Sequence, residues 1–187
     1  MPDIIQNNFG EVVQGIYRSG FPSLSLYRDH LKGVRAIIKL VEAPYAISIQ
    51  DFIVANGIQV ITFILKPNKG QGVRVSHKDM DDIMEMLLNI ENHPVLIHCN
   101  QGKHRTKCVV ACFRKLQGRE HSAIIDEDRL YAGHKARPLD EEFIRLYEPG
   151  AISQIAHEAN VVGWGQGRPI DKTRAPLLNL HMRKLWA

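Results

Sequence analysis

The stretch that decides the fold is "HPVLIHCNQGKHRTKCVVACFRKLQ", from His93 to Gln117. Its first part, "PVLIH" (94–98), is nearly continuous in apolar character, which predicts a strand covered on both faces. A polar turn that contains Gly102 follows the strand. From Arg105 onward the apolar residues recur at helical spacing. The stretch therefore predicts a strand, a tight loop and a helix, with Cys99 directly after the strand.

Other parts of the chain continue this alternation of strands and helices. Three further strands are predicted from "VVQGIYR" (12–18), "VRAIIKL" (34–40) and "IQVITFIL" (58–65), with helices around Leu24–Lys32 and Ile47–Asn56. The clearest helix follows Ser76, which resembles a capping pair with Asp79 and precedes apolar residues at three- and four-residue spacing (Met80, Ile83, Met84, Leu87, Leu88). Alternating strands and helices favour a mostly parallel sheet.

The C-terminal half has a different character. After Arg105 the pattern is helical to about His157, whereas "VVGWGQGRPIDKTRAP" (161–176) is rich in Gly and Pro and predicts extended or loosely ordered chain. We therefore expect an α/β fold: a central, mostly parallel sheet of four to five strands flanked by helices, with a helical C-terminal half. The expected organisation is one domain over residues 1–150 and a partly irregular C-terminal extension over 151–187.

Composition limits the classes of function. The chain has 187 residues, of which 44% are hydrophobic and 24% charged, as in an ordinary soluble globular domain. The net charge of +4 indicates weak affinity for anionic partners. Aromatic residues amount to 7% and do not interleave with the basic ones, so nucleic-acid binding has little support. No segment approaches the ~20 apolar residues that span a bilayer, so membrane insertion is not expected.

The cysteines indicate the redox setting. Cys99, Cys108 and Cys112 are odd in number and lie close together, which argues against a secreted, disulfide-stapled domain. We expect a reducing, cytoplasmic or nuclear location that keeps a thiolate available. The spacing also lacks a zinc pattern, because there is no CxxC and no histidine pair near Cys108 and Cys112. Neither a metal nor a cofactor is expected.

The residues around Cys99 predict anion chemistry. Ligands bind at the carboxyl ends of strands in open α/β sheets, and a Gly-containing turn followed by a helix N-terminus collects backbone N–H groups into an anion site. A thiol in that position has a lowered pKa. Arg105 offers a planar fork for phosphate oxygens, Thr106 a hydrogen bond to the sulfur, and His98 a support behind the loop. These are the parts of phosphoryl transfer through a phosphocysteine. A lone cysteine here is more often a buried apolar residue, but the C-x5-R spacing favours the nucleophile.

The run "HCNQGKHRT" (98–106) matches the signature loop of cysteine-dependent phosphatases. Its inner "GKHRT" resembles the plant and fungal atypical dual-specificity phosphatases, the Siw14-like inositol pyrophosphate phosphatases. Further motifs that resemble this family are "NFGEVVQGIYRSGFP" (8–22), "VRAIIKL" with the following "PY" and "NGIQV", and "KARPLDEEFI" (135–144). The resemblance covers residues 8–148 and implies the cysteine-phosphatase fold for residues 1–150.

The resemblance also implies an activity. Similar proteins remove the β-phosphate of inositol pyrophosphates, notably of the 5-diphosphoinositol type, without a metal, and several act on phosphotyrosine mimics. It implies that Cys99, Arg105, His98 and Thr106 are catalytic, and that Asn100, Gln101 and Gly102 bind the scissile phosphate. Two alternatives remain: a protein tyrosine or dual-specificity phosphatase, and a weakly active inositol-pyrophosphate-binding scaffold subunit beside related phosphatase paralogues.

A polyanionic substrate needs more cations than one arginine. We expect a cationic pocket formed in the signature loop and the other matching motifs by Lys103, His104, Arg18, Lys135 and Arg137. Structural explanations without a substrate also remain open. Lys135 and Arg137 would suit a solvated helix start, and Arg18 would suit a salt bridge at a strand end.

The sequence departs from the family pattern at two places. Lys107 stands where the family usually has Gly, and we expect it to point outward or to add a phosphate contact. In the family, an acidic residue lies in the loop after the third strand, but "KPNKGQGVRVSHKD" (66–79) has no carboxylate before Asp79. Asp79 is better explained as a negative charge at a helix N-terminus than as a general acid. Without a general acid, a phosphate leaving group is favoured over an aryl oxygen, so we expect a preference for phosphoanhydrides over aryl phosphates.

Some remaining polar and sulfur-containing residues have simpler explanations. The acidic trio Asp126, Glu127 and Asp128 favours a solvated helix face, although Asp126 could brace the loop. Cys108 and Cys112 favour core packing over a reversible disulfide with Cys99.

Overall fold

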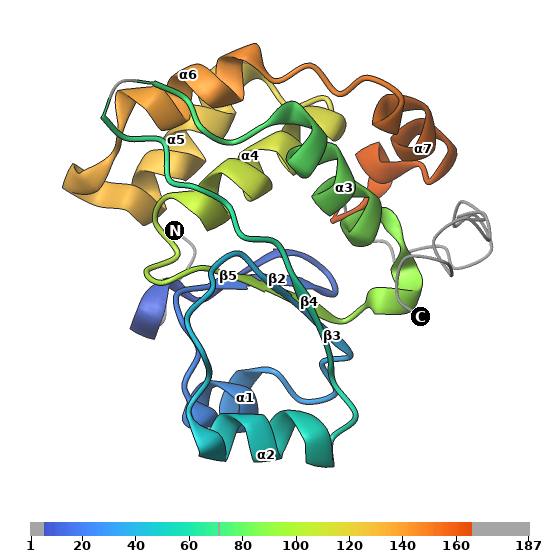
Figure 1. Cartoon of the computed structure of the whole chain (residues 1–187). Coiled ribbons are helices and arrows are strands. Elements are labelled where there is room, and N and C mark those ends of the chain that lie inside the picture. The colour runs from blue at the N-terminus through green and yellow to red at the C-terminus, as the bar shows by residue number, and fades with distance from the viewer. Residues whose placement is uncertain (1–5, 71, 166–187) are drawn as a thin grey trace.

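The computed structural model describes residues 6–70 and 72–165. A twisted sheet lies between two unequal layers of helices (Figure 1). Helices α1 (Leu24–His30) and α2 (Ile47–Ala55) cover one face, and the later helices cover the other. The mixed α/β architecture expected from the alternation of strands and helices is confirmed.

The sheet has five strands in the order β1-β2-β5-β3-β4, and all neighbouring pairs except β1 with β2 are parallel. The strands are β1 (Gly10–Val13), β2 (Ile16–Ser19), β3 (Ala36–Lys39), β4 (Gln59–Thr62) and β5 (Val95–His98). Because β5 lies between β2 and β3, its carboxyl end opens at the middle of the sheet edge, where open α/β sheets bind ligands.

The expectation of one strand over residues 12–18 is wrong. Val13 and Ile16 instead face each other across a tight turn that joins β1 to β2 as an antiparallel hairpin. Gly15 in this turn has φ +82°, a backbone conformation that glycine adopts at little cost. The pair "QG" between β-branched residues was the available signal for a turn.

The second helical layer is built from α3 onward. It consists of α3 (His77–Leu88), α4 (Arg105–Leu116), α5 (His121–Ala132), α6 (Pro138–Leu146) and α7 (Ile152–Glu158), with short 3-10 turns η1 (Gln6–Asn8), η2 (Ile90–Asn92), η3 (Gly133–Lys135) and η4 (Val161–Gly163). The predicted cap of α3 is confirmed, since the Asp79 backbone N–H donates to the Ser76 hydroxyl over 3.0 Å.

Each face of the sheet has its own core. On the α3–α4 side, Ile38, Ile97 and Val95 pack with the apolar residues of α3 (Met80, Ile83, Met84, Leu87, Leu88). On the other side, Ile37 and Leu96 pack with Leu26, Tyr27 and Ile53 of α1 and α2. The alternation along β3 and β5 supplies both cores, which explains why these strands are nearly continuous in apolar residues.

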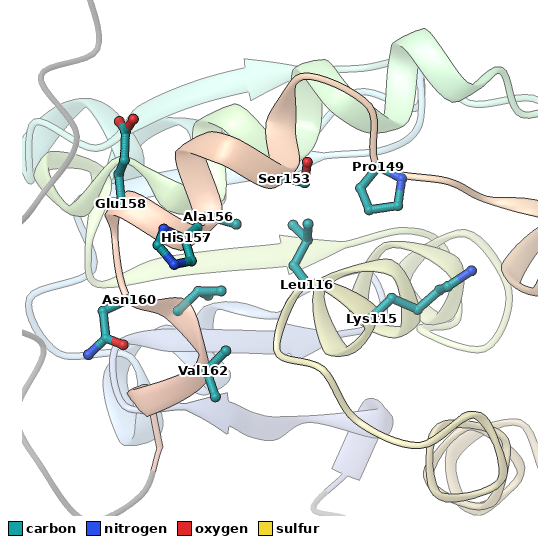
Figure 2. Close-up of a pocket in the computed structure, with 10 residues that line it drawn as sticks. Lys115, Leu116, Pro149, Ser153, Ala156, His157, Glu158, Asn160 and Val162 are labelled. Carbon is teal, nitrogen blue, oxygen red and sulfur yellow. The ribbon is translucent and has the colours of Figure 1, made fainter.

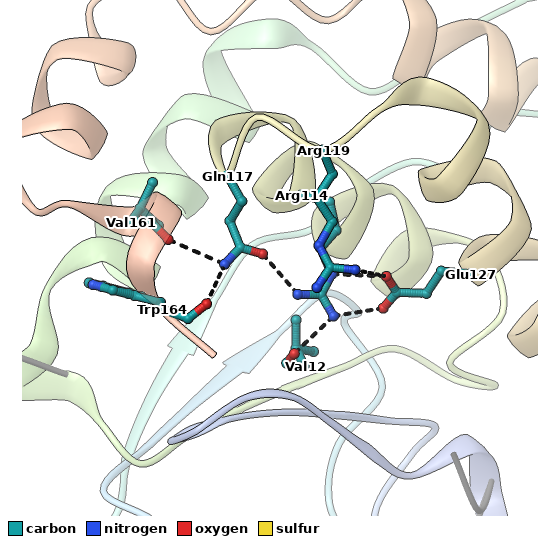
Figure 3. Close-up of polar contacts among 7 residues, drawn as sticks. All are labelled: Val12, Arg114, Gln117, Arg119, Glu127, Val161 and Trp164. Carbon is teal, nitrogen blue, oxygen red and sulfur yellow. Dashed lines mark hydrogen bonds and ion pairs between the residues drawn. The ribbon is translucent and has the colours of Figure 1, made fainter. Parts of the chain in front are cut away.

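The packed unit extends beyond the expected boundary at residue 150. Ile152 and Ala156 of α7, together with Val161 and Trp164, belong to the main core. Figure 3 shows how this segment is attached: the Gln117 amide donates to the carbonyls of Val161 and Trp164 over 3.2 and 3.0 Å. Residues 151–165 are therefore part of the domain, and the predicted irregular segment from 166 on lies outside the described residues.

A groove of about 670 Å³ lies between the C-terminal end of α4 and α7 (Figure 2). Lys115 and Leu116 line one side, and Ala156 and His157 line the other. Since a 12-residue helix is about 18 Å long, this groove is remote from the N-terminal end of α4. Among the described residues, no helix is both long and apolar enough to cross a membrane.

Candidate active site

Cys99 lies directly after β5, at the centre of the carboxyl edge of the sheet. Its side chain is 2% exposed and forms the floor of the signature loop, which we define as residues Cys99–Arg105. The loop ends where α4 begins at Arg105. The predicted sequence of strand, loop and helix is therefore confirmed, with the thiol at the position where an anion would meet the N-terminus of α4.

The carbonyl groups of the signature loop are held from outside. The Asn100 carbonyl accepts from the Phe21 backbone N–H over 3.0 Å. The Gln101 carbonyl accepts from the Asn8 side-chain amide over 2.8 Å. The Gly102 carbonyl accepts from Arg18 Nη2 over 3.0 Å. With the carbonyls turned outward, backbone N–H groups turn toward the sulfur, and the Gly102 N–H donates to Cys99 Sγ over 3.3 Å.

Gly102 is required by this geometry. Its φ is +68°, and a Cβ on it would lie 2.8 Å from the Gly20 nitrogen and 2.9 Å from the Ser19 carbonyl carbon. Side-chain-bearing residues are strained at such φ values and would also collide with the hairpin backbone. The glycine thus permits the signature loop to lie directly against the β2 end.

The surroundings of Cys99 favour a thiolate. Burial raises the pKa of the thiol, but hydrogen bonds from the Thr106 hydroxyl, the Thr106 and Gln101 backbone N–H groups and the charge of Arg105 outweigh it. The net result is a pKa below the ordinary cysteine value. Because the thiolate is the nucleophilic form, the geometry suits attack on phosphorus.

Arg105 connects the signature loop to the loop that follows β4. Its Nη1 lies 3.5 Å from the Leu65 carbonyl, and the side chain is half-buried. Asn68 is buried and closes the loop after β4, because its Oδ1 accepts from the backbone N–H groups of Arg74 and Val75 over 2.7 and 3.1 Å. Arg105 therefore lies beside the start of this loop, at Leu65, and the residues that follow in the sequence, 66–75, contain no Asp or Glu.

His98 supports the signature loop from behind, as expected. Its Nε2 lies 2.5 Å from the Tyr45 hydroxyl, and its Nδ1 lies 3.3 Å from the Cys99 carbonyl. Burial lowers the pKa of the imidazole to about 4, so the ring is neutral at pH 7. A neutral ring that donates from Nδ1 must accept at Nε2, and the Tyr45 hydroxyl is the donor. His98 thus holds the Cys99 backbone in position, and its assignment as a catalytic residue stays a prediction.

Arg18 is placed differently from the expected substrate pocket. Its side chain is 1% exposed, and its guanidinium carbon lies 3.7 Å from the centroid of the Tyr131 ring. Together with the hydrogen bond to the Gly102 carbonyl, this places Arg18 behind the signature loop, where it holds the loop instead of lining an open pocket.

The other predicted cations lie on or beside the signature loop. Lys103 is half-buried within it, and His104 Nδ1 lies 3.0 Å from Oδ2 of the buried Asp140. Lys135 is exposed and Arg137 half-buried, in the segment that leads into α6. Because Asp140 of α6 contacts His104, this segment lies next to the loop. Substrate binding by these four residues stays a prediction.

Lys107 does not point outward. It is 1% exposed on the first turn of α4 and forms an ion pair with Asp128 of α5, which is also buried. The solvated face expected for the acidic trio is therefore wrong for Asp128 and for Glu127, which pairs with Arg114 over 2.9 Å. Only Asp126 is exposed. A charged side chain can be buried when an opposite charge compensates it. The partner of Lys107 is 21 positions away in the sequence, so the local sequence around Lys107 does not reveal it.

Three remaining candidates have the simpler role. Asp79 is exposed on the first turn of α3, as expected for a helix N-terminal charge. Cys108 and Cys112 are buried free thiols whose pKa values are raised well above the ordinary value by burial, in agreement with core packing. Among the described residues, no group of three or more His, Cys, Asp and Glu has a metal-binding arrangement.

Sequence reasoning missed four residues that shape the site: Asn8, Tyr45, Asp128 and Asp140. Asn8, Tyr45 and Asp140 lie within or beside stretches that resemble family motifs, so the motifs held a signal for them. Asp128 gave none, because only the tertiary structure brings it to Lys107.

Comparison with known proteins gives consistent matches. A family model described as the tyrosine phosphatase family matches residues 4–166. The chain is 38% identical over 156 residues to the inositol diphosphatase SIW14 of Saccharomyces cerevisiae, covering 82% of this chain and 55% of that protein. It is 40% identical over 152 residues to the inositol diphosphatase DSP4 of Arabidopsis thaliana, covering 80% of this chain and 75% of that protein.

Among solved structures, the core catalytic domain of the PP-IP phosphatase SIW14 from S. cerevisiae, in complex with citrate, matches with a TM-score of 0.74 and 36% identity. The match covers 88% of this chain and 98% of that domain. The chain thus spans about half of the full yeast relative and nearly all of its catalytic core.

Proposed function

The chain belongs to the tyrosine phosphatase family, and from this membership we propose that it is a phosphatase that removes the β-phosphate of inositol pyrophosphates of the 5-diphosphoinositol type. The motif resemblance to the atypical dual-specificity branch is confirmed by the yeast and plant relatives. The chemistry is that of the cysteine-dependent members and requires no metal.

The observation that carries this proposal is the combination of two facts. The relatives with 38% and 40% identity are named inositol diphosphatases. The signature loop here presents a thiol of lowered pKa beside Arg105, with its carbonyls held outward. The first fact supports the substrate class and the second supports the capacity for phosphoryl transfer.

The proposed reaction has two steps. The Cys99 thiolate attacks the terminal phosphorus while the loop N–H groups and Arg105 hold the phosphoryl oxygens. The S–P bond forms, and the bond from phosphorus to the bridging oxygen breaks, so that this oxygen leaves with its electron pair on the phosphate that remains on the inositol. Water then attacks the phosphocysteine, the S–P bond breaks, and inorganic phosphate and the thiolate are released.

The loop after β4 supports a preference for phosphoanhydrides. Residues 66–75 contain Lys66, Lys69 and Arg74 and no Asp or Glu. General acid catalysis contributes about 10²–10⁴-fold where the leaving group needs a proton. A phosphate leaving group needs that proton less than an aryl or alkyl oxygen does. Cations near Arg105 would instead stabilise the negative charge of the leaving phosphate.

The test is phosphate release from a panel of inositol pyrophosphates and aryl phosphates. The wild-type chain and Cys99→Ser are measured side by side, at equal concentration and with folding checked by circular dichroism. We expect turnover of the diphosphates by the wild type, slower turnover of the aryl esters, and no turnover by Cys99→Ser. Efficient aryl phosphate hydrolysis with intact inositol pyrophosphates would contradict the substrate class, and turnover by Cys99→Ser would contradict the mechanism.

A second candidate is a protein tyrosine phosphatase, which the description of the matching family favours. The same panel, extended by a phosphotyrosine peptide, separates the two candidates. We also propose a cytoplasmic or nuclear location, since the three free cysteines suit a reducing setting. Association with related phosphatase paralogues stays a prediction.

A further inference from the structure

Buried ionisable side chains lie around the N-terminal end of α4. Lys107 on the first turn of α4 pairs with Asp128 of α5, and both side chains are at least 97% buried. His104, just before α4, contacts Asp140 of α6. Buried charges are rare and costly unless compensated, so their concentration behind the signature loop calls for a role.

Arg18 joins this group from the sheet. Its guanidinium donates to the Gly102 carbonyl and lies against the Tyr131 ring. Burial lowers the Arg18 pKa, whereas Tyr131, Glu127 and Asp128 of α5, together with Cys99, raise it. Arg18, Lys107 and Asp128 also line one small cavity between β2, α4 and α5. The Asp128 carboxylate therefore lies near two buried cations, one on α4 and one bound to the signature loop.

We infer that Asp128 is a positioning residue for the signature loop: its negative charge fixes Lys107 and Arg18 together, and Arg18 in turn fixes the Gly102 carbonyl. The Gly102 peptide carries the N–H that donates to Cys99, so a shift of its carbonyl changes the hydrogen bonding of the thiolate. The inference concerns the geometry of the signature loop. It rests on the proposed phosphatase function only where it predicts an effect on catalysis.

The buried pair serves position more than net stability. Burial raises the pKa of Asp128 to about 6, although Lys107 and Arg18 lower it, and Asp140 of α6 adds to the rise. The folded surroundings therefore favour the neutral carboxyl more than water does, although the carboxylate still predominates at pH 7. Buried ion pairs commonly add little stability, and conformational specificity is the better-attested reason to retain one. The substitution Asp128→Asn removes the charge, keeps the shape of the side chain, and leaves Lys107 buried without its partner.

The test compares Asp128→Asn with Asp126→Asn. Both substitutions remove one carboxylate from α5, but Asp126 is exposed. The pKa of Cys99 is measured from the pH dependence of alkylation by iodoacetamide, and the affinity of the site is measured with orthovanadate. Unfolding in urea reports stability separately.

A purely electrostatic role and a positioning role for Asp128 predict opposite changes in the pKa of Cys99. Loss of a negative charge alone would lower the pKa of Cys99. Displacement of the loop would raise it, because the thiolate loses hydrogen bonds. We expect Asp128→Asn to raise the pKa of Cys99 and to weaken orthovanadate binding about tenfold to a hundredfold, the effect of a small misplacement. Urea unfolding measures separately the stability lost because Lys107 stays buried without its partner. Asp126→Asn should match the wild type. An unchanged or lowered pKa with wild-type orthovanadate affinity overturns the inference.

A second variant keeps the test decisive if Asp128→Asn does not fold. Lys107→Met combined with Asp128→Leu replaces the pair by apolar side chains, a change that proteins commonly tolerate. Arg18 still loses its neighbour, so the pKa of Cys99 should rise and orthovanadate binding should weaken. Wild-type values of both would overturn the inference. Neither readout requires an inositol pyrophosphate, so failure of the proposed function leaves this test intact.

Discussion

At the scale of single residues, Gly102 has the narrowest tolerance in the candidate site. Its positive φ and the contact of a hypothetical Cβ with the Gly20 nitrogen at 2.8 Å both exclude a side chain. The two effects are separable, because Gly118 at the end of α4 has φ +70° with nothing within 4 Å of its Cβ position.

We predict that Gly102→Ala and Gly118→Ala each lose about 1–3 kcal/mol of unfolding free energy from backbone strain. Only Gly102→Ala should also lose activity, by about 10²–10³-fold, because its N–H and its neighbours leave their positions around the phosphoryl oxygens. Urea unfolding and phosphate release measure the two effects. Full activity of Gly102→Ala would show that the loop adapts to the clash.

Single residues also differ in how well the sequence predicts their place in the site. Cys99 and Arg105 were predicted because their spacing is local and its chemistry is specific. Lys107 was misplaced, because an isolated lysine at a helix start is normally solvated. Its burial depends on Asp128, which belongs to another helix. The position of Cys99 and Arg105 on one loop could thus be predicted from the sequence, and the pairs between elements, Lys107 with Asp128 and His104 with Asp140, could not.

At the scale of elements, α4 is fixed at both ends. Its N-terminal end carries the Lys107–Asp128 pair, and near its C-terminal end Arg114 donates to both oxygens of Glu127 at 2.9 Å each and to the Val12 carbonyl at 2.8 Å (Figure 3). Arg114 also donates to Gln117 over 2.8 Å. One side chain thus connects β1, α4 and α5.

Arg119 offers a matched control for Arg114, since it reaches the same Glu127 at 3.9 Å but is 50% exposed. We predict that Arg114→Met lowers the unfolding free energy by about 3 kcal/mol, because it removes one partner of a buried pair. Arg119→Met should cost about 0–1 kcal/mol, as exposed pairs do. Urea denaturation curves measure both losses of unfolding free energy. Equal losses would mean that the burial of Arg114 does not strengthen its contribution to stability.

Prediction of elements from the sequence succeeded where periodicity was strong and failed where a turn was short. The helix after Ser76 has both a cap and five buried residues at helical spacing, and it was predicted correctly. The β1–β2 hairpin was predicted as one strand because its turn is only Gln14 and Gly15. The end of the domain was set too early, since the contribution of Trp164 to the core becomes visible only in three dimensions.

At the scale of the whole molecule, two buried groups, His98 and Asp128, have pKa values that are shifted in opposite directions. The pKa of His98 is lowered to about 4, mainly by burial. Between about pH 6.5 and 4 the unfolded chain therefore binds a proton that the folded chain refuses, and stability falls as pH falls. The pKa of Asp128 is raised to about 6. Between about pH 4 and 6 the folded chain holds the extra proton, and stability rises as pH falls.

In the wild type these contributions offset each other over that window. Asp128→Asn removes the second and leaves the first, so the unfolding free energy of this variant should fall more steeply on acidification from about pH 6 to 4 than that of the wild type. One pKa unit corresponds to about 1.4 kcal/mol, so the two curves should diverge by up to about 3 kcal/mol. Urea unfolding at a series of pH values measures this divergence. Parallel curves would mean that Asp128 has the same pKa folded and unfolded, and that its carboxylate is compensated as well by Lys107 and Arg18 as by water.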